Sequence, residues 1–345
     1  MKKIIQDYNL KELEKLVEEM GEKPFRAKQL YSGIMRGHNI SDIPALPNAF
    51  KAKLSEQFED CAIEVVKTLV SADGTEKYLF RLADGNIIEG VLMKYKYGNT
   101  QCVSTQVGCR MGCKFCASTL GGLVRNLSSG EILSQVLKVN AMHGGTEKKR
   151  QVTNVVLMGS GEPLDNYENV IKFIRDMAAD GGINISPRNV SLSTCGLVPK
   201  MYGLAEEGLP VNLTVSLHNV TDEERARTMP IAKRYKIAEI LAACTNYFEK
   251  TGRRYIFEYS LIEGENADEA HARALISLLK GRPCHVNLIR LNEVKERALL
   301  AASEKNAQAF LKTLTAGGIS ATLRRRMGAD IGGACGQLRA GYINN

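Results

Sequence analysis

Apolar side chains recur at helical spacing through the first 60 residues of the chain. One stripe, which Gly21 ends, consists of Leu10, Leu13, Leu16, Val17 and Met20. Two later stripes contain Ala27, Leu30, Tyr31 and Ile34, then Phe50, Leu54 and Phe58. Pro44 and Pro47 separate these two stripes, since proline interrupts a helix. The pattern predicts a small helical accessory domain over residues 1–60.

The pattern changes to β-rich runs over residues 61–98. The runs are Ala62–Val70, Tyr78–Leu82 and Ile87–Tyr95. Asp73-Gly74 and Asp84-Gly85 separate them, and Asp-Gly pairs favour tight hairpin turns. A short antiparallel β meander is therefore predicted here.

From residue 99 to residue 345 the pattern alternates between strand and helix. The strands predicted are Cys102–Gln106, Val152–Met158, Asn189–Ser193, Val211–Ser216, Tyr255–Leu261 and His285–Ile289. The helices predicted lie over residues 129–142, 166–179, 222–226, 236–250, 267–280 and 303–316. Alternation of this kind predicts an α/β fold with a parallel sheet covered by helices. Six units indicate a partial (β/α)6 barrel, with its site at the carboxyl ends of the strands.

The charge balance suggests a polyanionic partner. The chain has 46 Lys and Arg against 38 Asp and Glu, a formal net charge of +8. Such a surplus suits nucleic acid, because phosphate contacts need cations, although many enzymes carry a similar excess. No apolar run reaches the roughly 18 residues of a membrane helix, and the first residues become polar too soon for a signal peptide. We expect a cytoplasmic protein with no membrane association.

The nine cysteines are unevenly distributed along the chain. Cys102, Cys109, Cys113 and Cys116 fall within 15 residues, and such crowding in a cytosolic protein indicates metal binding or catalysis. The last three form a C-x₃-C-x₂-C loop. Three thiolates can hold three irons of a cubane cluster and leave the fourth iron open. Structural zinc would need a fourth ligand, usually from a second pair, and no second pair follows. Cys61, Cys195, Cys244 and Cys284 are expected to be structural.

The cysteine loop, with Phe115 just before its last cysteine, resembles the motif of radical S-adenosylmethionine (SAM) enzymes. The resemblance implies one [4Fe–4S] cluster on Cys109, Cys113 and Cys116 whose open iron chelates SAM. One electron, from a donor such as flavodoxin or ferredoxin, would cleave SAM to a 5′-deoxyadenosyl radical. A non-catalytic iron–sulfur or zinc RNA-binding module is the alternative from another class.

Further motifs resemble the RlmN family of adenine-C2 RNA methyltransferases. They are Cys102–Gly108 (CVSTQVG), Gly121–Leu127 (GGLVRNL), Gly159–Leu164 (GSGEPL), Ser216–His218 (SLH) and Ala334–Leu338 (ACGQL). The resemblance covers essentially the whole chain and implies methylation of C2 of an adenine in 23S rRNA, with tRNA as a second substrate. The related Cfr enzymes, which methylate C8, share most of these motifs; Cys116–Thr119 (CAST) favours RlmN. A monomer is expected.

The same resemblance implies a set of SAM-binding residues. Gly161 and Glu162 would hold the SAM amino group, while the adenosine and sulfonium would be lined by Ser193, Ser216, Leu217, His218 and Asn292. Each lies at or just after a predicted strand end, where a barrel builds its site. One departure is Arg290, at a position where the family pattern has proline, which bears on the loop geometry of Asn292.

The resemblance also implies a covalent mechanism that uses two SAM molecules per turnover. Cys335, in the glycine-rich segment Gly332–Gly336, would accept a methyl group from the first SAM. The radical from the second SAM would remove a hydrogen from that methyl group, which then adds to C2. Cys102 would attack the Cys335 sulfur and release the base, leaving a disulfide. Glu89 matches the family's base for the C2 proton.

Two basic runs are candidate contacts to the RNA backbone, namely Lys148-Lys149-Arg150 and Arg324-Arg325-Arg326. Charge runs are also typical of solvated surfaces. The N-terminal helices are expected to dock RNA by shape, and a base buried in folded RNA must be extruded before it can react.

Overall fold

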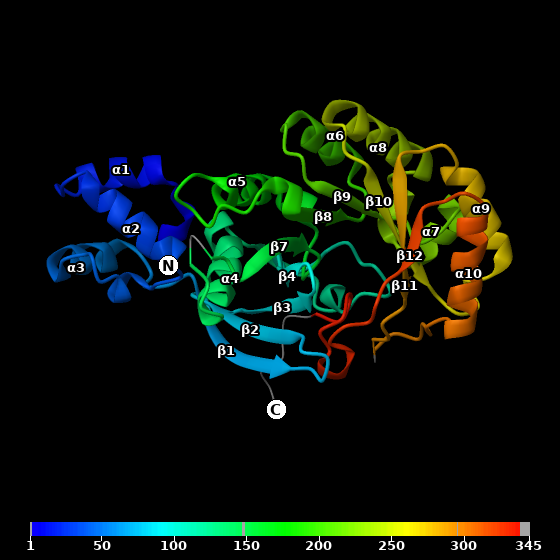
Figure 1. The fold of residues 1–345 in the computed structure, drawn as a ribbon, viewed down its shortest axis with the longest axis horizontal. Helices are drawn as coiled ribbons and strands as arrows, with labels where there is room; N and C mark the ends of the chain where they lie inside the picture. Colours follow the sequence, from blue (N-terminus) through cyan, green and yellow to red (C-terminus); the bar gives the residue numbers. More distant parts are fainter. Residues whose placement is uncertain (1, 147–148, 295, 339–345) are drawn as a thin grey trace.

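The computed structural model describes residues 2–146, 149–294 and 296–338. The chain begins with three helices that lie beside a long curved sheet (Figure 1): α1 (Leu10–Glu19), α2 (Phe25–Met35) and α3 (Asn48–Gln57). Asn9 starts α1, because its side chain accepts from the Glu12 N–H while the Glu12 carboxylate accepts from the Asn9 N–H. The predicted helical N-terminus is confirmed.

The predicted meander is also confirmed, as β1 (Ile63–Val70), β2 (Glu76–Leu82) and β3 (Ile87–Tyr95) in antiparallel order. Gly74 and Gly85 occupy its two turns with φ of +83° and +84°, a conformation that favours glycine. Strand β3 pairs antiparallel with β4 (Gly98–Cys102). The meander therefore continues directly into the sheet of the barrel.

Six parallel strands form the barrel: β4, β7 (Val152–Leu157), β8 (Val190–Thr194), β9 (Asn212–Ser216), β10 (Tyr255–Leu261) and β11 (Cys284–Arg290). The covering helices are α4 (Ser129–Met142), α5 (Tyr167–Ala178), α6 (Val198–Glu206), α8 (Ile237–Thr251), α9 (Glu269–Leu279) and α10 (Glu304–Ala316), with the short α7 (Asp222–Thr228) before α8. The partial (β/α)6 barrel is confirmed. None of the helices in the described ranges is long and apolar enough to cross a membrane.

The first barrel strand lies earlier than predicted: it is Gly98–Cys102, not Cys102–Gln106. The β-branched Val103 and Thr105 favoured a strand, but after the Val103 N–H donates to the Val156 carbonyl the chain leaves the sheet. It then forms β5 (Gln106–Gly108), paired with β6 (Leu123–Asn126) in a separate two-stranded sheet. Helix α6 and the last strand, β12 (Ala321–Leu323), were not predicted. Pro199 and Gly203 interrupt the helical pattern of α6, and β12 has only three residues, too few to show a period.

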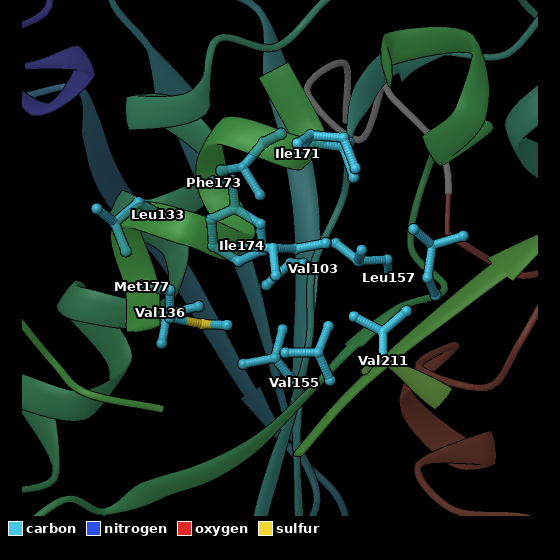
Figure 2. Packing of buried hydrophobic residues seen from close by; sticks show 14 of the residues in the cluster. Val103, Leu133, Val136, Val155, Leu157, Ile171, Phe173, Ile174, Met177 and Val211 are labelled. Carbon is cyan, nitrogen blue, oxygen red and sulfur yellow. The ribbon is translucent and has the colours of Figure 1, made fainter. Parts of the chain in front are cut away.

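The main core extends along the whole sheet, and Figure 2 shows the part of it between the sheet and helices α4 and α5. Val155 and Leu157 of β7 pack there with Val136 of α4 and Ile174 of α5, all nearly inaccessible to water. Burying these side chains stabilises the barrel and fixes where the strands end.

A C-terminal segment, residues 324–338, joins the two edges of the ten-stranded sheet. It leaves edge strand β12 and runs to the hairpin between β1 and β2 (Figure 1, red and blue). There the Gly328 N–H donates to Asp73 Oδ2 at 3.0 Å, and Lys77 Nζ donates to the Gly332 carbonyl at 3.1 Å. The segment carries Cys335.

Candidate active site

The three cysteines of the loop line one pocket at the carboxyl ends of the parallel strands, called here the loop pocket. Its other members include Glu162, Ser193, Ser216, His218, Glu258, Asn292 and Cys335. The loop is held by its backbone: the Cys109 N–H donates to the Gly122 carbonyl at 2.9 Å, and the Lys114 N–H to the Thr228 carbonyl at 2.8 Å. Gly108 is required beside it, because a Cβ there would lie 1.9 Å from the Gly122 oxygen.

The loop's donor set fits a multi-iron cluster. Burial raises the pKa of the Cys109 thiol to about 12, and burial also raises the pKa of Cys113 and Cys116. Thiolates at these positions therefore need a bound cation. In the part of the chain that is described, no three His, Cys, Asp or Glu side chains are grouped closely enough to share one metal ion. A cubane instead takes one thiolate on each of three irons.

The glycine-rich turn after β7 presents Gly161 and Glu162 to the loop pocket. Gly161 has φ of +109°, and a Cβ there would meet the Gln106 side chain at 2.7 Å. The buried Glu162 carboxylate accepts from the N–H groups of Cys195 at 2.7 Å and Leu164 at 3.1 Å. Burial raises its pKa. The Glu162 side chain thus fixes two loops that border the pocket.

Of the predicted residues on β8 and β9, Ser193 and Ser216 line the loop pocket. Leu217 does not: its side chain packs in the hydrophobic core, and its N–H donates to the Glu258 carbonyl at 3.0 Å. A role for Leu217 in binding would have to come from its backbone.

His218 is held in one orientation and one charge state. Its backbone has φ of +57°, which is strained for a residue other than glycine. Ring Nδ1 accepts from the Ser260 N–H at 2.9 Å, so the proton lies on Nε2. Burial, and then the Arg225 charge, lower the pKa of His218 to about 3. His218 therefore offers the pocket a neutral ring with an N–H donor.

Asn292 lines the loop pocket, and Arg290 does not prevent this. The Asn292 amide donates to the Cys335 carbonyl at 3.0 Å and lines the loop pocket. Arg290 forms an ion pair with Glu304 at 2.7 Å and donates to the Ala302 carbonyl at 3.0 Å. These bonds hold the arginine without displacing the asparagine.

Sequence reasoning missed three residues in and beside the loop pocket. Glu258 of β10 accepts from Arg324 at 3.2 Å and from Ser193 at 3.3 Å; a glutamate inside an apolar strand was the signal that could have found it. Arg225 is fully buried and donates to the carbonyls of Leu217, Cys195 and Ser216, yet nothing in its charged helix marked it. Cys195, expected to be structural, lines the pocket in contact with the cysteine loop.

A second pocket, called here the thiol pocket, brings Cys102 and Cys335 together. Its lining also includes Val91, Met93, Tyr95, Met158, Asn292, Arg324, Arg325, Arg326 and Leu338. Cys335 lines both pockets, whereas Cys102 lines only this one. Both are free thiols. Burial raises the pKa of Cys102 to about 12, and the Arg324 guanidinium opposes that shift.

Glu89 lies on β3, two residues before Val91, the first residue of that strand that lines the thiol pocket. It is completely buried and forms an ion pair with Lys77 at 2.9 Å. Within the described residues Glu89 lines neither pocket, although it faces the same side of β3 as Val91, which does. Because Lys77 also bonds Gly332, the ion pair reaches the segment that carries Cys335.

The two basic runs differ in how they are placed. Arg324 turns inward to Glu258, while Arg325 and Arg326 are exposed at the thiol pocket. In the other run, Arg150 donates to the Ile183 carbonyl at 3.4 Å, Lys149 is exposed, and Lys148 lies outside the described residues.

Comparison with known proteins identifies two families in the chain. Residues 103–275 match the model of the radical SAM superfamily. Residues 5–59 match the N-terminal domain of ribosomal RNA large subunit methyltransferases. The first match contains the cysteine loop, and the second coincides with the three N-terminal helices.

Relatives match over the full length of the chain. A probable dual-specificity RNA methyltransferase RlmN from Clostridium perfringens is 53% identical, over 100% of this chain and 99% of its own. The corresponding protein from Lachnoclostridium phytofermentans is 48% identical, over 99% and 95%. The crystal structure of a radical SAM methyltransferase from Sphaerobacter thermophilus superposes with a TM-score of 0.93 at 41% identity, covering 97% of this chain and 99% of its own. The chain therefore belongs to the RlmN family of radical SAM RNA methyltransferases.

Proposed function

We propose that this protein methylates C2 of an adenine in 23S rRNA, and an adenine of tRNA as a second substrate, through a methyl group carried on Cys335. The observation that carries the proposal is the position of Cys335, which lines both the loop pocket and the thiol pocket that holds Cys102. A methyl group on the Cys335 sulfur would therefore be accessible to SAM in the loop pocket and to an adenine in the thiol pocket. The related proteins named for dual-specificity RNA methylation support the choice of substrates.

The loop pocket would hold the cofactors of the family. Cys109, Cys113 and Cys116 would bind the [4Fe–4S] cluster, and two SAM molecules would be used per turnover. When bound, cluster and SAM supply a 5′-deoxyadenosyl radical that can remove hydrogen from a methyl group. Gly161 and Glu162 would face the SAM amino group, and the adenosine would lie against Ser193, Ser216, His218, Asn292 and the backbone of Leu217.

The two thiols would then divide the covalent chemistry. The Cys335 sulfur takes a methyl group as the sulfonium carbon–sulfur bond breaks, and that carbon later bonds to C2 of the adenine. Addition of the methylene radical to C2 would leave a base radical, which would return one electron to the bound cluster as the C2 proton leaves. Cys102 then attacks the Cys335 sulfur, so that a disulfide forms and the sulfur–carbon bond breaks. The released carbon keeps that electron pair and takes a proton as the methylated base leaves. Arg324 lies close enough to favour the thiolate of Cys102. An external dithiol must reduce the disulfide before the next turnover.

The C2 proton would pass to Glu89. Lys77 holds the Glu89 carboxylate within a buried ion pair and contacts the segment that carries Cys335. A flavodoxin or ferredoxin would supply the electron for SAM cleavage. A monomer, as expected from the sequence, is sufficient for this chemistry because one chain provides every proposed residue.

Glu162→Ala should weaken SAM binding without preventing cluster assembly. The substitution leaves the buried N–H groups of Cys195 and Leu164 without acceptors and loosens both loops at the pocket. Losing hydrogen bonds to a charged group costs about 1.5–3 kcal/mol, so SAM affinity should fall by roughly 10- to 100-fold. Calorimetric titration of SAM into the iron-loaded variant measures this.

Glu168→Ala is the matched control, because Glu168 is exposed on nearby α5. It should bind SAM as the unchanged protein does. Equal SAM affinity in the Glu162 and Glu168 variants would mean that the glycine-rich turn does not border the SAM site.

The choice of carbon is tested by mass spectrometry of rRNA and tRNA from cells with and without the protein. We expect 2-methyladenosine to depend on the intact chain. If 8-methyladenosine appears instead, the chain acts like a Cfr enzyme, and the proposed regiochemistry is wrong.

A further inference from the structure

Two tyrosine rings stand at the mouth of the thiol pocket. Tyr95 ends β3 and Tyr97 lies in the turn before β4; their rings stack with centroids 4.9 Å apart and planes 7° from parallel. Tyr97 is 74% exposed, so the outer face of the stack is open to solvent. Tyr95 lines the thiol pocket itself. An exposed aromatic surface thus adjoins the catalytic thiols.

Cations surround this stack. An outer pocket, continuous with the thiol pocket through Tyr95, Arg325 and Arg326, is lined by these residues with Lys94, Lys96, Tyr97, Met327 and Asp73. Lys96, Arg325 and Arg326 come from two different segments and are all exposed. Asp73, the one acid among the described residues of this lining, accepts from the N–H groups of Thr75 and Gly328. Lys94 is paired with Glu76 at 2.6 Å, which leaves Lys96, Arg325 and Arg326 as the exposed positive charges. The outer pocket is therefore strongly positive.

We propose that Tyr95 and Tyr97 form a stacking platform for the base next to the target adenine, with Lys96 and Arg325 on the phosphates of the same single-stranded segment. A flat ring open on one face suits any base, and cations beside it suit the backbone. This inference rests on the proposed function, because it assumes that the target adenine occupies the thiol pocket. The platform adds a subsite that would bind the neighbouring base whenever it is unpaired, whichever of the four bases it is.

The platform would also offset part of the free-energy cost of extruding the target adenine from its stack. An adenine that enters the thiol pocket leaves its stacking partners behind, which costs a few kcal/mol. Stacking the neighbour on Tyr97 would recover part of that loss. The occupant is RNA and not an acidic peptide, because the stacked parallel rings present a flat aromatic face on which a base can stack and which a carboxylate cannot use.

The test measures the affinity of anaerobic, iron-loaded protein for an RNA hairpin with an unpaired adenine in its loop, by fluorescence anisotropy. Tyr97→Ala should raise Kd about tenfold. Two further hairpins each carry an abasic site on one side of the adenine. Against one of them, Tyr97→Ala should have no further effect, since the base that stacks is already missing. Lys96→Ala and Arg325→Ala should each reduce the slope of log K against log salt by about one.

Tyr202→Ala, an exposed tyrosine on α6, and Lys312→Ala, an exposed lysine on α10, are the controls and should bind as the unchanged protein does. Reductive SAM cleavage without RNA should be unaltered in all variants, which shows that folding and the loop pocket are intact. An unchanged Kd for Tyr97→Ala, or a tenfold loss that persists with both abasic hairpins, overturns the platform. Methylation at a carbon other than C2 would overturn the proposed function while leaving these binding results in place.

Discussion

Cys102→Ala should trap the protein on its RNA as a covalent adduct, whereas Cys335→Ala should form no adduct at all. The two sulfurs meet in the thiol pocket, but only Cys335 also lines the loop pocket where a methyl group would be delivered. Without Cys102, Cys335 can still be methylated and still join C2, yet no thiolate remains to break the sulfur–carbon bond. Product formation should fall below detection in both variants.

Denaturing gel electrophoresis of labelled RNA separates the two outcomes. The Cys102→Ala adduct should survive denaturation and disappear on nuclease digestion. Cys61→Ala, which changes a free cysteine that lines neither pocket, should turn over normally and show no adduct. An adduct in both catalytic variants, or in neither, would reject the division of roles between the thiols.

Replacing any one of Cys109, Cys113 and Cys116 with alanine should abolish both cluster assembly and SAM cleavage. Three thiolates are the fewest that hold a cubane while leaving one iron open for SAM. Cys109 and Cys113 are buried and Cys116 is half-buried. Alanine supplies no ligand at any of the three positions, so the expected loss of bound iron is nearly complete. Iron analysis, the absorption spectrum and detection of 5′-deoxyadenosine measure it.

Cys195→Ala provides a demanding control, because Cys195 packs against the same loop and lines the same pocket. Glu162 accepts from the backbone N–H of residue 195, which alanine retains. This variant should assemble a normal cluster and cleave SAM. Loss of the cluster in Cys195→Ala, or its retention in a loop variant, would show that the ligand set has been assigned wrongly.

Periodicity predicted most of the fold, because each barrel strand and most helices are long enough to show a repeat. The strand Tyr255–Leu261 and the helix over 129–142 were predicted with the observed bounds. The first barrel strand was placed late because the β-branched Val103 and Thr105 look like part of a strand in isolation. Only pairing with β3 and β7, which is a tertiary fact, ends that strand at Cys102.

The candidate site could be predicted where a motif lies in one loop and not where contacts are assembled from distant strands. The C-x₃-C-x₂-C spacing and the Gly-Glu turn are local patterns. Arg225 gains its position from carbonyls on other elements, and no local pattern marks it. Glu258 stands out only as a glutamate inside an apolar strand, and its partner Arg324 comes from a distant segment. Leu217 shows that a motif residue can place its side chain in the core, which leaves only its backbone for the proposed binding role.

The C-terminal segment has a consequence for attempts to dissect or redesign the enzyme. The portion that matches the radical SAM superfamily, residues 103–275, contains the cysteine loop but neither Cys102 nor Cys335. The segment that bears Cys335 is hydrogen-bonded to Asp73 and Lys77, which lie at the opposite edge of the sheet. A fragment cut at the family boundaries would contain the cysteine loop but would lack β4, β11 and both cysteines of the thiol pocket. Moving the proposed methyl carrier, Cys335, onto another barrel would require transplanting the β1–β2 hairpin with it.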